Sequence, residues 1–392
     1  MFIAYKYRLI ILCLIAFIVT WLVFKPILKI AKTKNIVDCP DQRKLQKSPI
    51  PILGGVAVFF GIIVALSFYK TMISYTSLFP VLSAMGIMLY LGLIDDILST
   101  KPSTRFLLEI VVALLIIYGL KAYIGNFHGL WGINLINREL GIVLSIITFI
   151  GIVNSINMID GIDGLSSAFS ILILGCLGIV CFIGRCYSFS VLSAVMIGAL
   201  IPFFLHNVFG YTTKMFIGDA GTMMVGTAIS SMVFIILSKR FPLTELYPAL
   251  DFNLIALCLA VLSIPIGDTI RVMFMRMLNH KSPFKPDKTH LHHFFIAAGV
   301  SYIWTTILEI AMNILVILVF FLVWHLGASD AVQLYTVILL TLVMDIGSCK
   351  ILSDIAQEKS SITGPASKLA ARSHVERKGF WLRIQKIIDK ED

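Results

Sequence analysis

Charged residues are scarce in this sequence. Of its 392 residues only 14% are Asp, Glu, Lys or Arg, whereas 58% are hydrophobic, and the mean hydropathy is +0.93. A soluble domain of this size needs far more polar surface, because average proteins carry about 25% charged residues. The composition therefore excludes an ordinary soluble protein and predicts an integral membrane protein.

Cysteine pairs, internal repeats and a signal-peptide cleavage site are also lacking. The seven cysteines lie mostly inside apolar segments and form no CxxC pair, which disfavours a disulfide framework or a cysteine metal site. No repeat of the kind that many transporters carry is visible. The first apolar run, Leu9–Phe24, is not followed by a small-residue cleavage pattern, so we expect it to be the first membrane span.

About eleven apolar runs predict an all-α polytopic membrane protein. They lie near residues 9–25, 52–69, 78–94, 106–120, 140–157, 165–183, 189–205, 220–237, 252–275, 304–324 and 331–349. With the N-terminus outside, the cytoplasmic segments are 25–51, 95–105, 154–164, 206–218, 271–303 and the tail from 350. This arrangement places 24 of the 32 Lys and Arg residues inside, so the positive-inside rule favours an external N-terminus and a cytoplasmic C-terminus.

The chain is expected to form one membrane domain with a tail. We assign residues 1–352 to the transmembrane domain and residues 353–392 to a basic cytoplasmic tail. The end of the tail, GFWLRIQKII, has the pattern of an interfacial amphipathic helix. The net charge of +10 needs no nucleic-acid partner, because basic loops of this kind face anionic lipid head groups.

Acidic residues gather at the predicted cytoplasmic helix ends. Carboxylates at membrane level are costly and are therefore functional candidates. A solvated loop or a helix cap is the alternative for any one of them, but five on one face are less well explained by independent capping. The five are Asp95, Asp96, Asp160, Asp163 and Asp219.

The adjacent Asp95 and Asp96 cannot point the same way from one helix. We expect one of them to hold a cation while the other faces a substrate or a basic partner, for which Lys101 and Arg105 are the candidates. Asp219 lies just before a predicted helix, between two glycines, where it suits an N-cap, a cation ligand or both.

Three further acids, Glu109, Glu309 and Asp345, lie inside spans or near their ends. For these three, pairing with a neighbouring helix is the favoured interpretation. Asn154, Asn157 and Asp160 recur every three residues, so they share one face if the helix continues that far.

The segment RMLNHKSPFKPDKTHLHHFF forms a strongly cationic loop with three histidines. A zinc site is one alternative, since histidine is a common zinc ligand. The surrounding Lys and Arg residues disfavour a second cation, and all these side chains donate hydrogen bonds to phosphate. Carboxylates for a divalent cation and basic groups for phosphates on one face indicate phosphoryl transfer, with Mg²⁺ or Mn²⁺ as the metal and a lipid as one substrate.

Five segments, PIPILGG, LGLIDDI, NSINMIDGIDGLSS, FIGDAG and PDKTHLHH, follow in this order between about residues 25 and 300. Together they resemble the polyprenyl-phosphate N-acetylhexosamine-1-phosphate transferases, and the histidine segment looks like their GlcNAc-type branch. The resemblance implies transfer of an N-acetylhexosamine 1-phosphate from a UDP-sugar to undecaprenyl phosphate, with release of UMP and use of Mg²⁺ or Mn²⁺. It also implies a multi-pass protein of the bacterial inner membrane that initiates a cell-envelope glycan.

The resemblance implies roles for particular residues. Asp95 and Asp96 match the catalytic aspartate pair, and Asp219 and Asn154 match metal ligands. Some relatives have a third carboxylate where this chain has Ser99. The residues that match substrate-binding positions are Lys47, Asn157, Asp160, Asp163, Phe216, Arg276, His290, His292 and His293.

Several alternatives stay open at this point. The transfer can be direct, or it can pass through a phosphorylated aspartate before the lipid enters. A transporter of a lipid-linked or phosphorylated sugar is the competing class, although transporters usually place their charges near the midplane. The aminosugar, the downstream polymer and the oligomeric state, including a homodimer, are not defined by the sequence.

Overall fold

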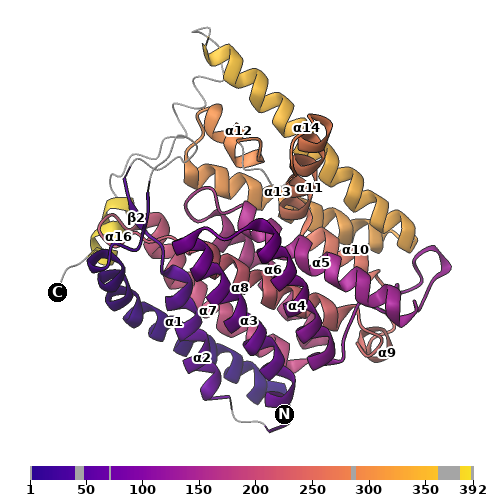
Figure 1. Ribbon diagram of the computed structural model, residues 1–392. Helices are drawn as coiled ribbons and strands as arrows, with labels where there is room; N and C mark the ends of the chain where they lie inside the picture. The colour runs from indigo at the N-terminus through magenta and orange to yellow at the C-terminus, as the bar shows by residue number, and fades with distance from the viewer. Residues whose placement is uncertain (1, 40–47, 70–71, 284–287, 361–379, 390–392) are drawn as a thin grey trace.

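The computed structural model describes residues 2–39, 48–69, 72–283, 288–360 and 380–389 (Figure 1). Helices dominate this part of the chain. They are α1 (Phe2–Thr33), α2 (Gly54–Ser67), α3 (Met72–Leu98), α4 (Pro102–Leu120), α5 (Arg138–Met158), α6 (Leu165–Ile183), α7 (Tyr187–Phe209), α8 (Gly218–Ile236), α9 (Leu243–Leu246), α10 (Leu254–Val261), α11 (Ser263–Leu278), α12 (Leu291–Ala297), α13 (Tyr302–His325), α14 (Asp330–Ser360) and α16 (Phe380–Ile388), with a 3₁₀ turn η1 at Leu130–Gly132.

The only strands in the described residues are two residues long. β1 (Val37–Asp38) and β2 (Ile50–Pro51) pair antiparallel, with Val37 opposite Pro51. The expected all-helical fold is therefore correct except for this short hairpin, which precedes α2.

Nine helices of the described chain are long and apolar enough to cross a membrane: α1, α3 to α8, α13 and α14. The bent pair α10 and α11 adds a tenth if it forms one span. α2 occupies another predicted run, but its 14 residues extend only about 21 Å, less than the ~30 Å hydrocarbon core. A multi-pass helical protein is confirmed, and nine or ten spans meet the length requirement where eleven were expected.

The predicted span at 252–275 is broken. α10 and α11 meet at an angle of 76°, so the run predicted as one span is divided between two helices. The buried side chain of Asn313 on α13 pins the break: its Oδ1 accepts from Ile264 N at 3.1 Å and from Ser263 Oγ at 3.0 Å, and its Nδ2 donates to Val261 O at 3.1 Å. A break at membrane depth is tolerated because this carboxamide satisfies the backbone groups that the helix leaves free.

α8 is the most buried of the spans and lies among α2, α3, α5 and α6 (Figure 1). Glycines allow this close packing. A Cβ on Gly55 would lie 2.5 Å from the backbone of Gly221, and a Cβ on Gly92 would lie 2.3 Å from the backbone of Ala220. The end of α3 is therefore pressed against the beginning of α8, one turn before the Asp95–Asp96 pair.

Several predicted loops are shorter than expected. α3 continues to Leu98 and α4 begins at Pro102, so only three residues remain of the 95–105 loop. α14 runs through the proposed domain boundary at residue 352. The predicted terminal amphipathic helix is present as α16, which lies with β2 away from the N-terminus of α1 (Figure 1).

Candidate active site

A cavity of about 620 Å³ opens where several helices begin or end. The ends of α3, α5 and α11 meet the beginnings of α4, α8 and α12 there. The helix ends bring side chains from distant parts of the chain together. The polar and charged lining residues include Asp95, Thr100, Ser103, Arg105, Glu109, Asn154, Asn157, Asp219, Arg276, His290, His292 and His293.

Arg105 is the centre of the contacts inside this cavity. Its Nη1 atom lies 3.1 Å from Asp95 Oδ2 and 3.2 Å from Asp219 Oδ2, so one nitrogen bridges two carboxylates. Its Nε donates to Glu109 Oε1 at 3.2 Å, and its Nη2 donates to Asn157 Oδ1 at 3.1 Å. Lys101 and Arg105 were the two expected basic partners of the aspartate pair, and Arg105 is the one that contacts Asp95.

The two carboxylates that Arg105 bridges differ in their exposure. Asp95 Oδ1 accepts from Thr100 N at 2.7 Å and from Thr100 Oγ1 at 2.6 Å, which occupies the oxygen that Arg105 leaves open. The side chain of Asp219 is 36% exposed against 15% for Asp95. Asp219 therefore presents the more accessible carboxylate to the cavity.

Asn157 is the asparagine that reaches Asp219. Its Nδ2 donates to Asp219 Oδ1 and to Thr222 Oγ1, both at 2.8 Å. Asn154 points instead to Glu109 Oε2, to which its Nδ2 donates at 2.9 Å. The sequence assigned Asn154 to the metal, whereas the contacts bring Asn157 beside the acidic pair and leave Asn154 supporting Glu109.

Asp96 caps a helix from outside. Its Oδ1 accepts from Asp219 N at 3.0 Å and its Oδ2 from Ala220 N at 3.3 Å. Asp96 thus satisfies the first amides of α8, which has no capping side chain of its own, and its charge suits the positive end of the helix. The cap expected of Asp219 is supplied by Asp96, and Asp96 does not line the cavity.

The loop after α5 carries two aspartates away from the cavity. Asp160 is exposed and its Oδ1 accepts from Ser166 Oγ at 2.5 Å. Asp163 Oδ2 accepts from Lys214 Nζ at 2.5 Å, and this nitrogen lies 5.9 Å from the ring centroid of Phe216.

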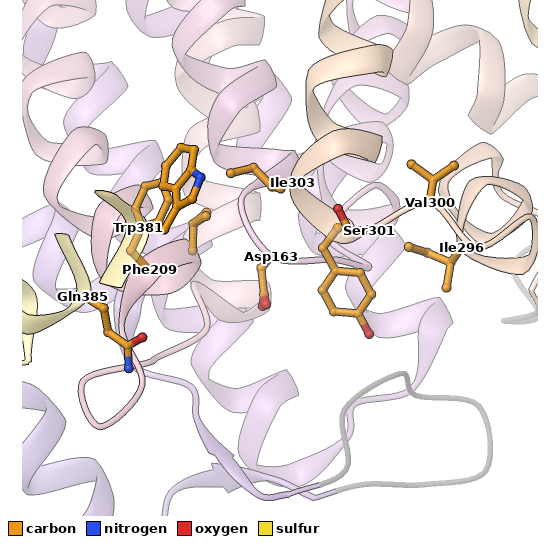
Figure 2. Close-up of a pocket in the computed structure, with 11 residues that line it drawn as sticks. Asp163, Phe209, Ile296, Val300, Ser301, Ile303, Trp381 and Gln385 are labelled. Atoms are coloured by element: carbon orange, nitrogen blue, oxygen red, sulfur yellow. The ribbon is translucent and has the colours of Figure 1, made fainter. Parts of the chain in front are cut away.

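Asp163 instead lines a second cavity of about 430 Å³. Figure 2 shows Asp163 between Ser301 on one side and Trp381 and Gln385 of α16 on the other. Asp163, Lys214 and Phe216 therefore form a separate group beside the main cavity. Lys47, expected to bind substrate, lies outside the described residues.

A buried ion network holds the histidine loop. Asp268 on α11 accepts from His290 Nδ1 at 2.7 Å and from Leu291 N at 2.9 Å. Arg271 donates to Asp268 Oδ1 at 2.5 Å and to Asp345 Oδ2 at 2.9 Å. Because a carboxylate oxygen can only accept, the proton of the His290–Asp268 bond is on Nδ1, and Nε2 is the nitrogen left for a ligand.

The other predicted basic residues also line the main cavity. Arg276 is buried and donates from Nη1 to Pro283 O at 2.6 Å. His292 is 1% exposed and packs against Gly161, where a Cβ would lie 2.2 Å from its Nε2. Burial, together with the neighbouring His293 and His290, lowers the pKa of His292 to about 3, so this ring is neutral near pH 7.

Sequence reasoning missed the roles of Asp268 and Arg271. Their spacing of three residues inside an apolar run was the available signal. The expected pairing of intramembrane acids with neighbouring helices is confirmed for Glu109, through Asn154, and for Asp345, through Arg271. In the described structure Oε1 of the buried Glu309 has no hydrogen-bond partner.

The fold and this cavity define a class of protein: a multi-pass helical membrane protein whose helix ends gather carboxylates, carboxamides and cations at one end of the bundle. Residues 78–237, which run from α3 to the end of α8, match the model of glycosyl transferase family 4. This part of the chain is similar to that family.

Curated relatives resemble most of the chain. The undecaprenyl-phosphate alpha-N-acetylglucosaminyl 1-phosphate transferase of Escherichia coli strain K12 is 28% identical over 277 residues, which cover 69% of this chain and 72% of that protein. The protein of the same name from Yersinia pestis is 29% identical over the same shares. A probable undecaprenyl-phosphate N-acetylglucosaminyl 1-phosphate transferase of Bacillus subtilis strain 168 is 28% identical over 296 residues, 74% of this chain and 78% of that protein.

Replacing Arg105 tests whether it holds the acidic cavity together. In the absence of divalent cations we expect Arg105→Met to lower the free energy of unfolding by roughly 3 kcal/mol, because Asp95, Glu109 and Asp219 lose their shared cation. Adding Asp219→Asn to this variant should recover part of the loss, since one uncompensated charge is removed. Thermal unfolding in detergent measures both changes.

Lys101→Met is the matched control for that experiment, because Lys101 was the other candidate partner and is exposed. Its unfolding midpoint should equal that of the parent chain. Equal stability of the Arg105 and Lys101 variants would contradict the bridging role of Arg105.

Proposed function

We propose that this protein transfers N-acetylglucosamine 1-phosphate from UDP-GlcNAc to undecaprenyl phosphate, giving undecaprenyl-diphosphate-GlcNAc and UMP. The observation that carries the proposal is the cavity in which Arg105 bridges Asp95 and Asp219, and which Arg276 and three histidines also line. It is supported by the relatives from Escherichia coli and Bacillus subtilis, which are named as an undecaprenyl-phosphate N-acetylglucosaminyl 1-phosphate transferase and a probable one. In the cell we place the cavity on the cytoplasmic face of the bacterial inner membrane, with the N-terminus outside.

The metal proposed for this reaction is Mg²⁺ or Mn²⁺. Asp219 is the carboxylate best placed to hold it, with Asp95 and the side chain of Asn157 beside it. The described residues contain no cluster of three or more His, Cys, Asp or Glu side chains fit for a metal. Mg²⁺ is usually bound by one or two protein carboxylates together with the phosphates of the substrate. When bound, the cation neutralises charge on the diphosphate.

In the proposed step an oxygen of the lipid phosphate attacks the β-phosphorus of the UDP-sugar. A new bond forms between that oxygen and phosphorus, the bond from the β-phosphorus to the bridging oxygen breaks, and the electron pair leaves with UMP. The lipid phosphate is already anionic near pH 7, so no strong general base is required. Arg105 and Arg276 stabilise the negative charge on the phosphoryl oxygens as it is redistributed.

Direct transfer is favoured over a phospho-aspartate intermediate at Asp95. Both oxygens of Asp95 accept hydrogen bonds, from Thr100 and from Arg105, and such bonds stabilise the ionised form and reduce its nucleophilicity. Both oxygens of Asp96 accept from the backbone of α8. We therefore assign Asp95 to orienting Arg105, and Asp96 to fixing the start of α8 that carries Asp219.

His290 is proposed to contact phosphate through Nε2, with Asp268 as its positioning residue. Asp268 accepts the Nδ1 proton and thereby sets the tautomer and the direction of the ring. Arg271 keeps Asp268 ionised in its buried place, and Asp345 holds Arg271. The gathering of charges at one end of the bundle weighs against the transporter alternative, which usually has them at midplane.

Purified protein given Mg²⁺, UDP-GlcNAc and undecaprenyl phosphate should release UMP. We expect Asp219→Ala to reduce this rate by at least about 10²-fold, because the most accessible carboxylate of the cavity is lost. The same substitution at the exposed Asp354 on α14 should leave the rate unchanged. Absence of UMP release with every UDP-N-acetylhexosamine would refute the function, and rapid UMP release without lipid would refute direct transfer.

Asp268→Asn tests the positioning of His290. The carboxamide has nearly the same shape but can donate a proton toward Nδ1, which favours the wrong tautomer of the ring. We expect kcat to fall by about 10–100-fold with little change in KM for the UDP-sugar. The pH profile of kcat should also shift, which loss of packing alone would not produce.

Asp345→Asn is the control for this variant, because it touches Arg271 and leaves the Asp268–His290 bond intact. Asp345→Asn should lower the midpoint of thermal unfolding and leave kcat nearly unchanged. Equal effects of the two variants on kcat would show that Asp268 has only a structural role.

A further inference from the structure

The terminal helix α16 is docked on the end of α7. The indole of Trp381 stacks on the ring of Phe209, with centroids 5.2 Å apart and planes 12° from parallel. Ile388 is 3% exposed, whereas Arg383 and Lys386 face outward. The helix therefore buries one face against the protein and leaves a basic face outside.

The residue after α16 forms the most specific contact. The Asp389 carboxylate accepts from the backbone N–H of Tyr211 at 3.0 Å, and from those of Thr212 and Thr213 at 3.2 Å each. The hydroxyl of Thr213 donates to it at 2.9 Å. Three successive amides that converge on one anion form a nest. Burial raises the pKa of Asp389, but the hydrogen bonds from Thr213 and the amides outweigh this and lower the pKa, so the group is ionised at neutral pH.

This contact fixes one end of a short segment that carries Phe216, a predicted substrate-binding residue. Lys214, the next residue, donates to Asp163 at 2.5 Å. At the other end Phe216 N donates to Pro51 O at 2.7 Å, which ties the segment to β2. Asp389 is thus an anchor on the side of the segment that β2 does not hold, together with Lys32, whose Nζ donates to Thr212 O at 2.7 Å.

α16 also forms a wall of the second cavity. Figure 2 shows Trp381 and Gln385 on one side, Asp163 between, and Ser301 on the other side. Phe209 and Tyr302 complete the apolar part. Removal of α16 would open this cavity beside Asp163 and release the anchor of residues 211–213.

We propose that α16 is a positioning element for the nucleotide end of the substrate site: Asp389 holds the segment that presents Lys214 and Phe216, and Trp381 with Gln385 closes the cavity beside Asp163. The proposal rests on the proposed function, since it takes the UDP-sugar as the ligand of this side. It requires binding of the UDP-sugar, and not of the lipid phosphate, to depend on the C-terminal tail.

Steady-state kinetics of three variants in the full-length background test the proposal. We expect deletion of residues 380–392 and Asp389→Ala each to raise KM for UDP-GlcNAc by about 10-fold, with KM for undecaprenyl phosphate and kcat changed less than twofold. Asp389→Asn should restore part of the affinity, because its Oδ1 still accepts from the amides. Arg383→Ala, on the outward face of the same helix, should behave as the parent.

Two results would overturn the proposal while leaving the proposed function intact. One is an active parent whose KM for UDP-GlcNAc is unchanged or lowered by the deletion; a lowered KM would mean that α16 obstructs the site. The other is an equal rise in both KM values, which would indicate a general structural role.

Hydrogen exchange tests the contact of Asp389 with residues 211–213 independently of enzyme activity. The amides of residues 211–213 should be protected in the parent and exchange at least about 10-fold faster in Asp389→Ala, with or without substrate. Unchanged exchange overturns the anchor even if the enzyme is inactive. A parent that shows the protection but turns over no UDP-sugar would refute the proposed function instead.

Discussion

The bridge that Arg105 forms between Asp95 and Asp219 is the interaction on which the site depends. Two carboxylates placed side by side near the end of a membrane bundle repel one another, and the repulsion is weakly screened there. A guanidinium can contact several acceptors at once because its five N–H groups lie in a rigid plane. Arg105 uses this geometry to hold Asp95, Asp219, Glu109 and the carboxamide of Asn157. The cavity is thereby set before any phosphate enters, which is the preorganisation that phosphoryl transfer needs.

Helix packing brings the partners within reach of that bridge. Gly92 lets the end of α3 lie against the backbone at Asp219 and Ala220, and Asp96 then caps the amides of α8 from the neighbouring helix. A similar arrangement is found at the α10–α11 break. The break between α10 and α11, pinned by Asn313, precedes the helix whose Asp268 directs His290. At the first place Asp96 supports the backbone of α8, and Asp219 lines the cavity. At the second place Asn313 supports the broken backbone, and His290 lines the cavity.

The sequence was sufficient to predict the membrane class, the positions of the apolar helices and most cavity residues, because intramembrane carboxylates are costly and periodicity groups them. It could not rank Asn154 and Asn157, since both share a face and only the rotation of α5 against α8 decides which reaches Asp219. The break at residue 262 was hidden in an uninterrupted apolar run, because the Asn313 that stabilises it comes from another helix. Asp268 was missed because its partner His290 is 22 residues away. The site thus depends on pairings between helices, which local patterns do not encode.

The most direct test of this account is the location of Mn²⁺ in an anomalous difference map of crystals grown with Mn²⁺ and UDP-GlcNAc. The account predicts one strong peak about 2.0–2.3 Å from an oxygen of Asp219 and near the carboxamide of Asn157, with the diphosphate facing Arg105. A peak beside Asp160 or Asp163 with none at Asp219 would contradict it, because the carboxylates that Arg105 brings together would then not be the metal site.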